Sequence, residues 1–294
     1  MSQFGNFHDF CRASTLPVCN LFFVRKECVL EGFKAGDGRV RNLGSIILCA
    51  FAIIVSVLLL LLSQKKRAAV GRREMQIFLI LYILVSLVEV FTVGGFLTDR
   101  TVLVWFTGIH LGAIAATAWV LLLNAVVGFQ LVDDGTPLSV GLVAGSALAF
   151  FVGTAYVAVD TGFGEPGNFP IKNINEPKNY ALYVLYLLFP LIAIAAFLIL
   201  ESFLVLRVLG EVMPMARLGA AALFFAIGQI FNFVISVHIC DASNGKIDGA
   251  FFETLFTLLA VVAVWLFWSS ITEDEWPDDD PMNPMMSESG YPPP

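Results

Sequence analysis

The segment Phe251–Ile271 reads FFETLFTLLAVVAVWLFWSSI, and the sequence TEDEWPDDDP follows it directly. A helix needs about 20 apolar residues to cross the roughly 30 Å hydrocarbon core of a bilayer, so this segment is long enough to span one. The acidic stretch that follows cannot enter the hydrocarbon, and no Lys or Arg occurs after Ile271. The pattern predicts a membrane-spanning helix that ends in an acidic peptide exposed to one compartment.

The rest of the chain is also apolar. It has 294 residues, of which 58% are hydrophobic and 14% charged, with a mean hydropathy of +0.82. Soluble domains carry about 25% charged residues. We predict an all-α, polytopic membrane protein with seven transmembrane helices. Their expected ranges are Gly44–Leu62, Met75–Leu97, Val102–Asn124, Leu138–Val159, Tyr180–Leu206, Leu218–His238 and Ala250–Ile271.

These ranges divide the chain into three parts. We expect an N-terminal segment at 1–43, a seven-helix bundle at 44–271 and an acidic tail at 272–294. The first residues lack the basic and apolar regions of a cleavable signal peptide, so we expect the first helix to direct insertion. Pro190 lies inside the fifth helix, where we expect a kink, because neighbouring groups in a membrane bundle can satisfy the freed carbonyl. The basic residues are not clustered as a nucleic-acid partner would require.

The distribution of basic residues predicts an orientation. Short loops rich in Lys and Arg stay in the cytoplasm. One side of the bundle carries Lys65, Lys66, Arg67, Arg72, Arg73, Arg207 and Arg217, and the other carries Arg100, Lys172, Lys178 and Lys246. We therefore expect a lumenal N-terminus and a cytoplasmic C-terminus, although the N-terminal segment contains six basic residues of its own.

The cysteines agree with this orientation. Cys49 lies inside the first helix, whereas Cys11, Cys19, Cys28 and Cys240 all fall on the expected lumenal side. Four cysteines in an oxidising compartment predict two disulfides, with three possible pairings. The alternative is four reduced thiols.

Few polar residues lie within the predicted spans, and such residues are functional candidates by default. Glu89 on the second helix and His110 on the third are too few for a zinc site, so we expect a hydrogen bond between these helices. Gln229 and Asn232 share one face of the sixth helix and are expected to bind it to a neighbour. Glu201 lies near a helix end, where its side chain can reach the membrane interface.

Glycines recur at a spacing that allows close helix contact. Gly108 and Gly112 lie on the third helix, and Gly141 and Gly145 lie on the fourth. Small residues four positions apart let two helices approach closely in lipid. The contact could be inside the bundle or with a partner protein.

No catalytic motif is present. The chain has no Gly-x-Ser-x-Gly sequence and no phosphate-binding loop. The last helix has no Lys for a retinal Schiff base, and no cofactor is expected. Three classes of protein remain: a seven-helix receptor, a transporter of small solutes or lipids, and a non-catalytic membrane partner.

Two blocks of sequence resemble a known family. The N-terminal FGNFHDFCRASTLPVCNLF and the block from His238 to Trp276 are similar to the fungal chitin synthase export chaperones. The resemblance extends over essentially the whole chain. It implies an endoplasmic reticulum membrane protein that lets a chitin synthase fold and leave that compartment, in support of cell-wall chitin synthesis and without catalysis. The expected partner is a chitin synthase.

The acidic tail has two interpretations. Its clusters resemble di-acidic export signals that engage vesicle coat machinery. They could also be a solvated end that holds the last helix in place, with Trp276 at the interface. The residues concerned are Glu273, Asp274, Glu275, Asp278, Asp279 and Asp280.

Overall fold

The structure is a computed structural model that describes residues 4–35, 38–66, 68–130, 135–171 and 177–272. Within these residues, seven helices are long and apolar enough to cross a membrane, which confirms the predicted bundle. The first four spans are each a single uninterrupted α-helix: α2 Leu43–Lys65, α3 Arg72–Val93, α4 Arg100–Gly128 and α5 Pro137–Phe163. The last is α10 Gly249–Ser270. The predicted ends lie within five residues of the observed ones, and the largest difference is at the start of the sixth span.

The fifth and sixth spans contain wider, π-helical turns. The fifth runs Tyr180–Leu209 and the sixth Met213–Ala242. Pro190 has no N–H and crowds the carbonyl four residues earlier, so a regular α-helical turn is unavailable there. The π-helical segment η2 lies just before it and absorbs the irregularity. The predicted disturbance at Pro190 is therefore a widened turn. The segments of the two spans are α6 Tyr180–Tyr183, η2 Val184–Leu188, α7 Phe189–Phe203, η3 Leu204–Leu209, α8 Met213–Ile230, η4 Phe231–Ile235 and α9 Ser236–Ala242.

Local sequence sets where most spans begin. In five of them the residue before the first helical position accepts a hydrogen bond from a backbone N–H of the first turn, which otherwise has no partner. The five capping residues are Asn42, Asp99, Thr136, Asn179 and Asp248. These helix starts can be recognised from Asn, Asp or Thr directly before an apolar run.

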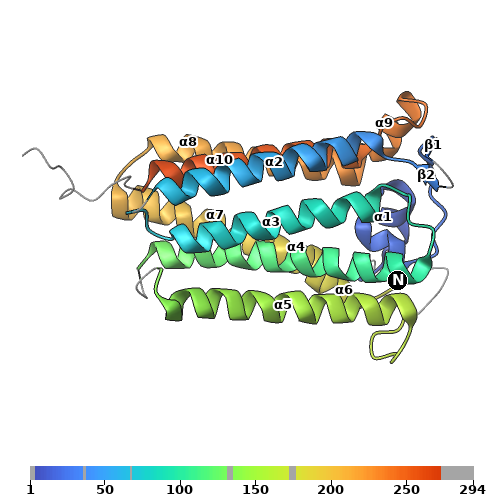
Figure 1. Cartoon of the computed structure of the whole chain (residues 1–294), viewed down its shortest axis with the longest axis horizontal. Helices are drawn as coiled ribbons and strands as arrows, with labels where there is room; N and C mark the ends of the chain where they lie inside the picture. Colours follow the sequence, from blue (N-terminus) through green and yellow to red (C-terminus); the bar gives the residue numbers. More distant parts are fainter. Residues whose placement is uncertain (1–3, 36–37, 67, 131–134, 172–176, 273–294) are drawn as a thin grey trace, which may run out of the picture.

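The N-terminal segment folds over one end of the bundle. It contains α1 His8–Ala13, the 3₁₀ turn η1 Pro17–Leu21, and a hairpin of β1 Phe33–Ala35 with β2 Gly38–Val40. The all-α prediction therefore holds for the bundle and omits this hairpin. Figure 1 shows α1, the hairpin and α9 at the same end of the bundle. We call the described residues of 4–42 the cap, and the end they cover the capped end.

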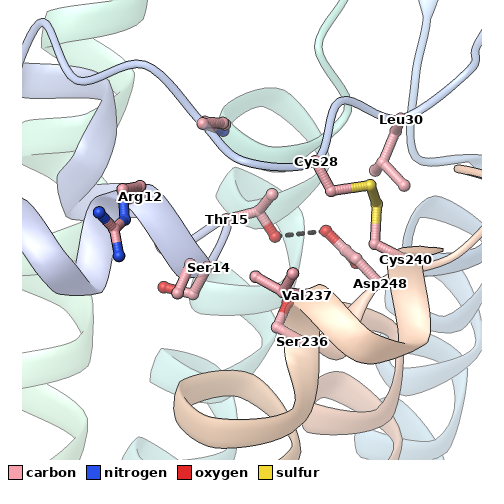
Figure 2. Close-up of a pocket in the computed structure, with 11 residues that line it drawn as sticks. Arg12, Ser14, Thr15, Cys28, Leu30, Ser236, Val237, Cys240 and Asp248 are labelled. Carbon is pink, nitrogen blue, oxygen red and sulfur yellow. Dashed lines mark hydrogen bonds between the residues drawn. A yellow bond between two sulfur atoms is a disulfide. The ribbon is translucent and has the colours of Figure 1, made fainter.

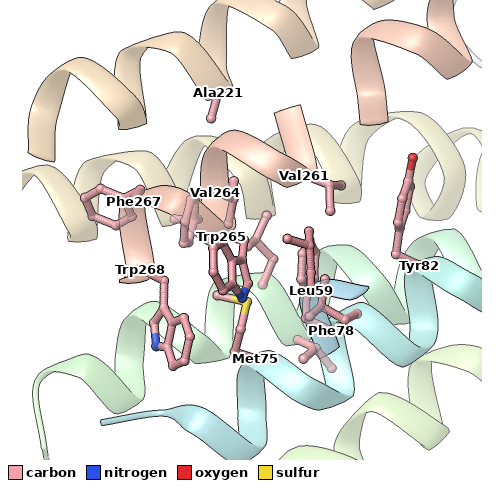
Figure 3. Close-up of a cluster of buried hydrophobic side chains, with 14 of the residues drawn as sticks. Leu59, Met75, Phe78, Tyr82, Ala221, Val261, Val264, Trp265, Phe267 and Trp268 are labelled. Atoms are coloured by element: carbon pink, nitrogen blue, oxygen red, sulfur yellow. The ribbon is translucent and has the colours of Figure 1, made fainter. Parts of the chain in front are cut away.

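Two apolar cores hold these parts together. The larger lies away from the capped end, and Trp265 and Trp268 of α10 pack there with Met75 and Phe78 of α3, as Figure 3 shows. Both indole N–H groups are satisfied, since Trp265 Nε1 donates to Ser63 Oγ at 2.8 Å and Trp268 Nε1 to the Val70 carbonyl at 2.9 Å. The smaller core lies under the cap. Its fully buried members include Phe7, Val18, Leu21, Val104, Ala158 and Leu182.

Candidate functional site

Two disulfides fix the cap. Cys11 is bonded to Cys19, which closes a loop between α1 and η1, and Cys28 is bonded to Cys240 of α9. Of the three pairings left open by the sequence, the structure has this one. The second bond ties the cap to the connection between the sixth and seventh spans, and Figure 2 shows it beside Asp248.

Asp248 joins the cap to two helices. Thr15 Oγ1 donates to Asp248 Oδ2 at 2.5 Å, and Asn42 Nδ2 donates to Asp248 Oδ1 at 3.3 Å (Figure 2 draws the first bond). The same carboxylate caps α10 through the Ala250 N–H at 3.2 Å. Burial lowers the pKa of nearby Lys26, and the negative charge of Asp248 partly opposes this. This network was not predicted from the sequence, although Asp directly before an apolar run is the signal of a helix start.

The polar residues inside the bundle have other partners than predicted. His110 Nδ1 is hydrogen-bonded to Thr92 Oγ1 at 2.8 Å, so a bond between the second and third spans exists, but its partner is not Glu89. Glu89 Oε1 instead accepts from Thr254 Oγ1 of α10 at 2.6 Å. The α10 helix packs against α2 and α8. In that position its Thr254 hydroxyl is within hydrogen-bond distance of the Glu89 carboxyl on α3.

Two further expectations concern polar residues of the fifth and sixth spans. Asn232 was expected to bind a neighbouring helix, and its Oδ1 has no donor among the described residues. Glu201 does not reach the interface, because it is buried and its Oε2 also has no described partner. Gln229, on the same face as Asn232, is hydrogen-bonded to the Glu253 carboxyl of α10, in agreement with its expected contact with a neighbouring helix. Helical spacing placed these side chains on a face correctly, but could not show what that face meets.

The two glycine pairs lie in opposite surroundings. A Cβ on Gly108 would lie 2.6 Å from Val159 Cγ2, and one on Gly112 would lie 2.6 Å from the Phe151 carbonyl oxygen. These glycines therefore form the α4–α5 contact. A Cβ on Gly141 or Gly145 would meet nothing within 4 Å. The α5 pair faces outward, toward the bilayer.

The acidic clusters of the tail, Glu273–Glu275 and Asp278–Asp280, lie outside the described residues. Their interpretation as an export signal stays a prediction.

Comparison with known proteins identifies the family. A family profile described as chitin synthase export chaperone matches residues 3–280. The chain belongs to the chitin synthase export chaperone family. Similar proteins include the chitin synthase export chaperone of Cryptococcus neoformans var. neoformans serotype D, which is 31% identical over 278 residues, with 93% of this chain and 76% of the relative covered.

Other members of the chitin synthase export chaperone family are similar over nearly the same length. That of Chaetomium globosum is 28% identical over 283 residues, covering 92% of this chain and 83% of the relative. That of Gibberella zeae is 28% identical over 286 residues, covering 94% and 84%. The family is named for a chaperone role and not for a catalysed reaction.

Proposed function

We propose that this protein is a membrane chaperone of the endoplasmic reticulum that binds a chitin synthase, helps it fold and permits its export. The observation that carries the proposal is the family match across residues 3–280, which includes the cap and all seven spans. The protein itself catalyses no reaction. Its N-terminus lies in the lumen, where disulfides form and persist, and its tail lies in the cytoplasm.

The open face of α5 is the proposed contact for the client. It consists of Gly141, Gly145, Ala149 and Gly153, which are all exposed and follow one another at intervals of four residues. Helices in lipid associate through close packing, because burial from lipid supplies no hydrophobic driving force between them. A transmembrane helix of the synthase could pack closely along this face until its own assembly is complete.

Affinity purification of the full chain in mild detergent, followed by mass spectrometry, tests the function. A chitin synthase should be the dominant partner. Recovery of a G protein would support the receptor class, and recovery of a bound transport substrate without a synthase would support a transporter; either result contradicts the proposal.

The contact face is tested separately with Gly145→Leu. The matched control is Ala195→Leu, which adds bulk at an exposed position of α7. We expect less synthase to co-purify with the first variant and an unchanged amount with the second. Equal recovery from both, with both proteins monodisperse, would remove α5 as the contact.

The tail is proposed to carry the export signal that vesicle coat machinery reads. Replacing Asp278–Asp280 by Ala should reduce delivery of the synthase to the cell surface without reducing its co-purification. Unchanged delivery removes this triplet from the signal and leaves Glu273–Glu275 to be tested in the same way.

The oxidation state of the cap is tested with single Cys→Ser variants on non-reducing gels. Cys28→Ser and Cys240→Ser should give the same mobility change, because each removes the same bond. Four variants that all migrate like the unsubstituted chain would show that the thiols are reduced.

A further inference from the structure

A cavity of about 420 Å³ lies inside the bundle, away from the α5 face. Its walls come from α3, α4, α7, α8 and α10, and Thr15, Leu16 and Pro17 of the cap close it at one end. Pockets that hold a small organic ligand have volumes of roughly 300–1,000 Å³. The cavity is therefore large enough for a ligand and not only for water.

The cavity is polar near the cap and apolar farther in. Polar side chains reach it at the capped end, and the deeper wall includes Phe197, Ala221 and Val264. From Glu253 to Val264, the lining of α10 extends for about 16 Å at 1.5 Å per helical residue. This division matches a molecule with a polar head and a longer apolar body. The polar lining residues are Thr15, Tyr82, Glu89, His110, Thr117, Tyr186, Gln229, Asn232, Glu253, Thr254 and Thr257.

The polar end contains an acceptor that the described residues leave unused. Asn232 is 3% exposed, lines the cavity, and has no described donor for its Oδ1. Neither Glu89 nor Glu253 forms an ion pair with any residue that the structure describes, and the described lining includes no Lys or Arg. Unpaired polar groups within a membrane are costly. A ligand that donates a hydrogen bond would supply what the Asn232 oxygen lacks.

The cavity also reaches the bilayer-facing surface. Leu191 of α7 lines the cavity and is 59% exposed. Direct packing between α7 and α8 is sparse, in contrast with the close packing of α8 on α10. Both spans carry π-helical turns at the cavity, which contribute Tyr186 and Asn232 to the lining. Such turns are frequent at functional sites. A lipid could therefore enter sideways between α7 and α8.

We propose that this cavity binds one amphipathic lipid whose head donates a hydrogen bond to Asn232 Oδ1 while its apolar body lies between α7, α8 and α10. A sterol hydroxyl and the ammonium of a long-chain amine share this chemistry. An ammonium has further N–H donors and would in addition meet the Glu253 carboxyl, whereas a hydroxyl has a single donor and needs only the Asn232 oxygen.

Photolabelling of the purified full chain tests the proposal. A photoreactive sterol and a photoreactive long-chain amine are added separately to the chain in detergent, irradiated, and mapped by mass spectrometry. We expect one probe to label lining segments of α7, α8 or α10 and to be displaced by its unlabelled form. Ala222→Phe, which fills the cavity, should lower this labelling about tenfold, the equivalent of roughly 1.4 kcal/mol in binding. Ala195→Phe, at an exposed position of α7 outside the lining, should not.

Two further variants distinguish the heads. Amine labelling that falls with Glu253→Gln assigns an ammonium, and sterol labelling that survives Glu253→Gln but falls with Asn232→Leu assigns a hydroxyl. Labelling that is not displaced, that maps outside the lining, or that is equal in Ala222→Phe and Ala195→Phe overturns the proposal. If Ala222→Phe is not monodisperse, the displacement and mapping on the unsubstituted chain decide in the same way.

Discussion

The small-residue faces of α4 and α5 have the same spacing and opposite neighbours. On α4, Gly108 and Gly112 lie directly under α5, so that a Cβ on either would lie 2.6 Å from an atom of that helix. On α5, Gly141 and Gly145 have open space where a Cβ would be. The glycine spacing therefore shows that another helix can pack closely on this face. Only the fold shows whether a helix of the same chain already does so.

The largest effect is expected where the α4–α5 contact leaves no room. Gly112→Leu should destabilise the protein by about 3 kcal/mol or more, because the Phe151 carbonyl oxygen is backbone and cannot turn aside. The measurement is the fraction of monodisperse protein in size-exclusion chromatography, with its thermal midpoint. Gly145→Leu is the control and should keep both values. A monodisperse Gly112→Leu with an unchanged midpoint would contradict the closed contact.

The next effect is on the open face, and it concerns binding and not folding. Gly145→Leu should weaken synthase binding about tenfold, or roughly 1.4 kcal/mol, by preventing close approach to α5. The measurement is synthase recovered at equal amounts of chaperone, across a series of chaperone concentrations. A loss of thermal stability in this variant would show that the face is packed in the folded protein.

A smaller effect is expected where the α4–α5 contact continues under the cap. A Cβ on Gly162 of α5 would lie 2.6 Å from Val104 Cγ1 and 3.1 Å from Leu21 Cδ2, both of which are side-chain atoms that can shift. Gly162→Ala should therefore cost about 1 kcal/mol in stability, at the lower end of overpacking effects. Gly153→Ala, on the open side of the same helix, is the matched control. Equal thermal midpoints for the two variants would show that the cap does not press on this contact.

The smallest effect is expected for a hydrogen bond across the same contact. Trp119 Nε1 of α4 donates to Ser146 Oγ of α5 at 2.9 Å. Trp119→Phe should cost about 0.6 kcal/mol, the average for such bonds within membranes. Trp105→Phe is the control, since Trp105 lies on α4 and is 53% exposed. A thermal shift as large as that of Gly112→Leu would contradict this ranking and show that the hydrogen bond matters as much as the glycine packing.

Sequence predicted the spans well because each one is a local property. Length and hydropathy identify a segment such as Leu138–Val159, and Thr136 before Pro137 marks its start. The candidate sites depend on contacts between residues that are far apart in the sequence, and they were predicted less well. Asn232 and Glu201 were assigned to the right helices, yet the first faces a cavity and the second is buried. Neither outcome is encoded in the spacing along one helix.

The sequence by itself determined a seven-span helical bundle, because backbone groups in lipid must be satisfied within each helix. It also determined that the chain belongs to the chitin synthase export chaperone family, because the similarity extends over residues 3–280. Tertiary structure decided which cysteines meet, that Glu89 pairs with Thr254, and which glycine face is closed. Those outcomes depend on contacts between residues far apart in the chain, such as Cys28 and Cys240. Hydropathy and spacing describe one helix at a time, so they constrain such contacts without selecting among them.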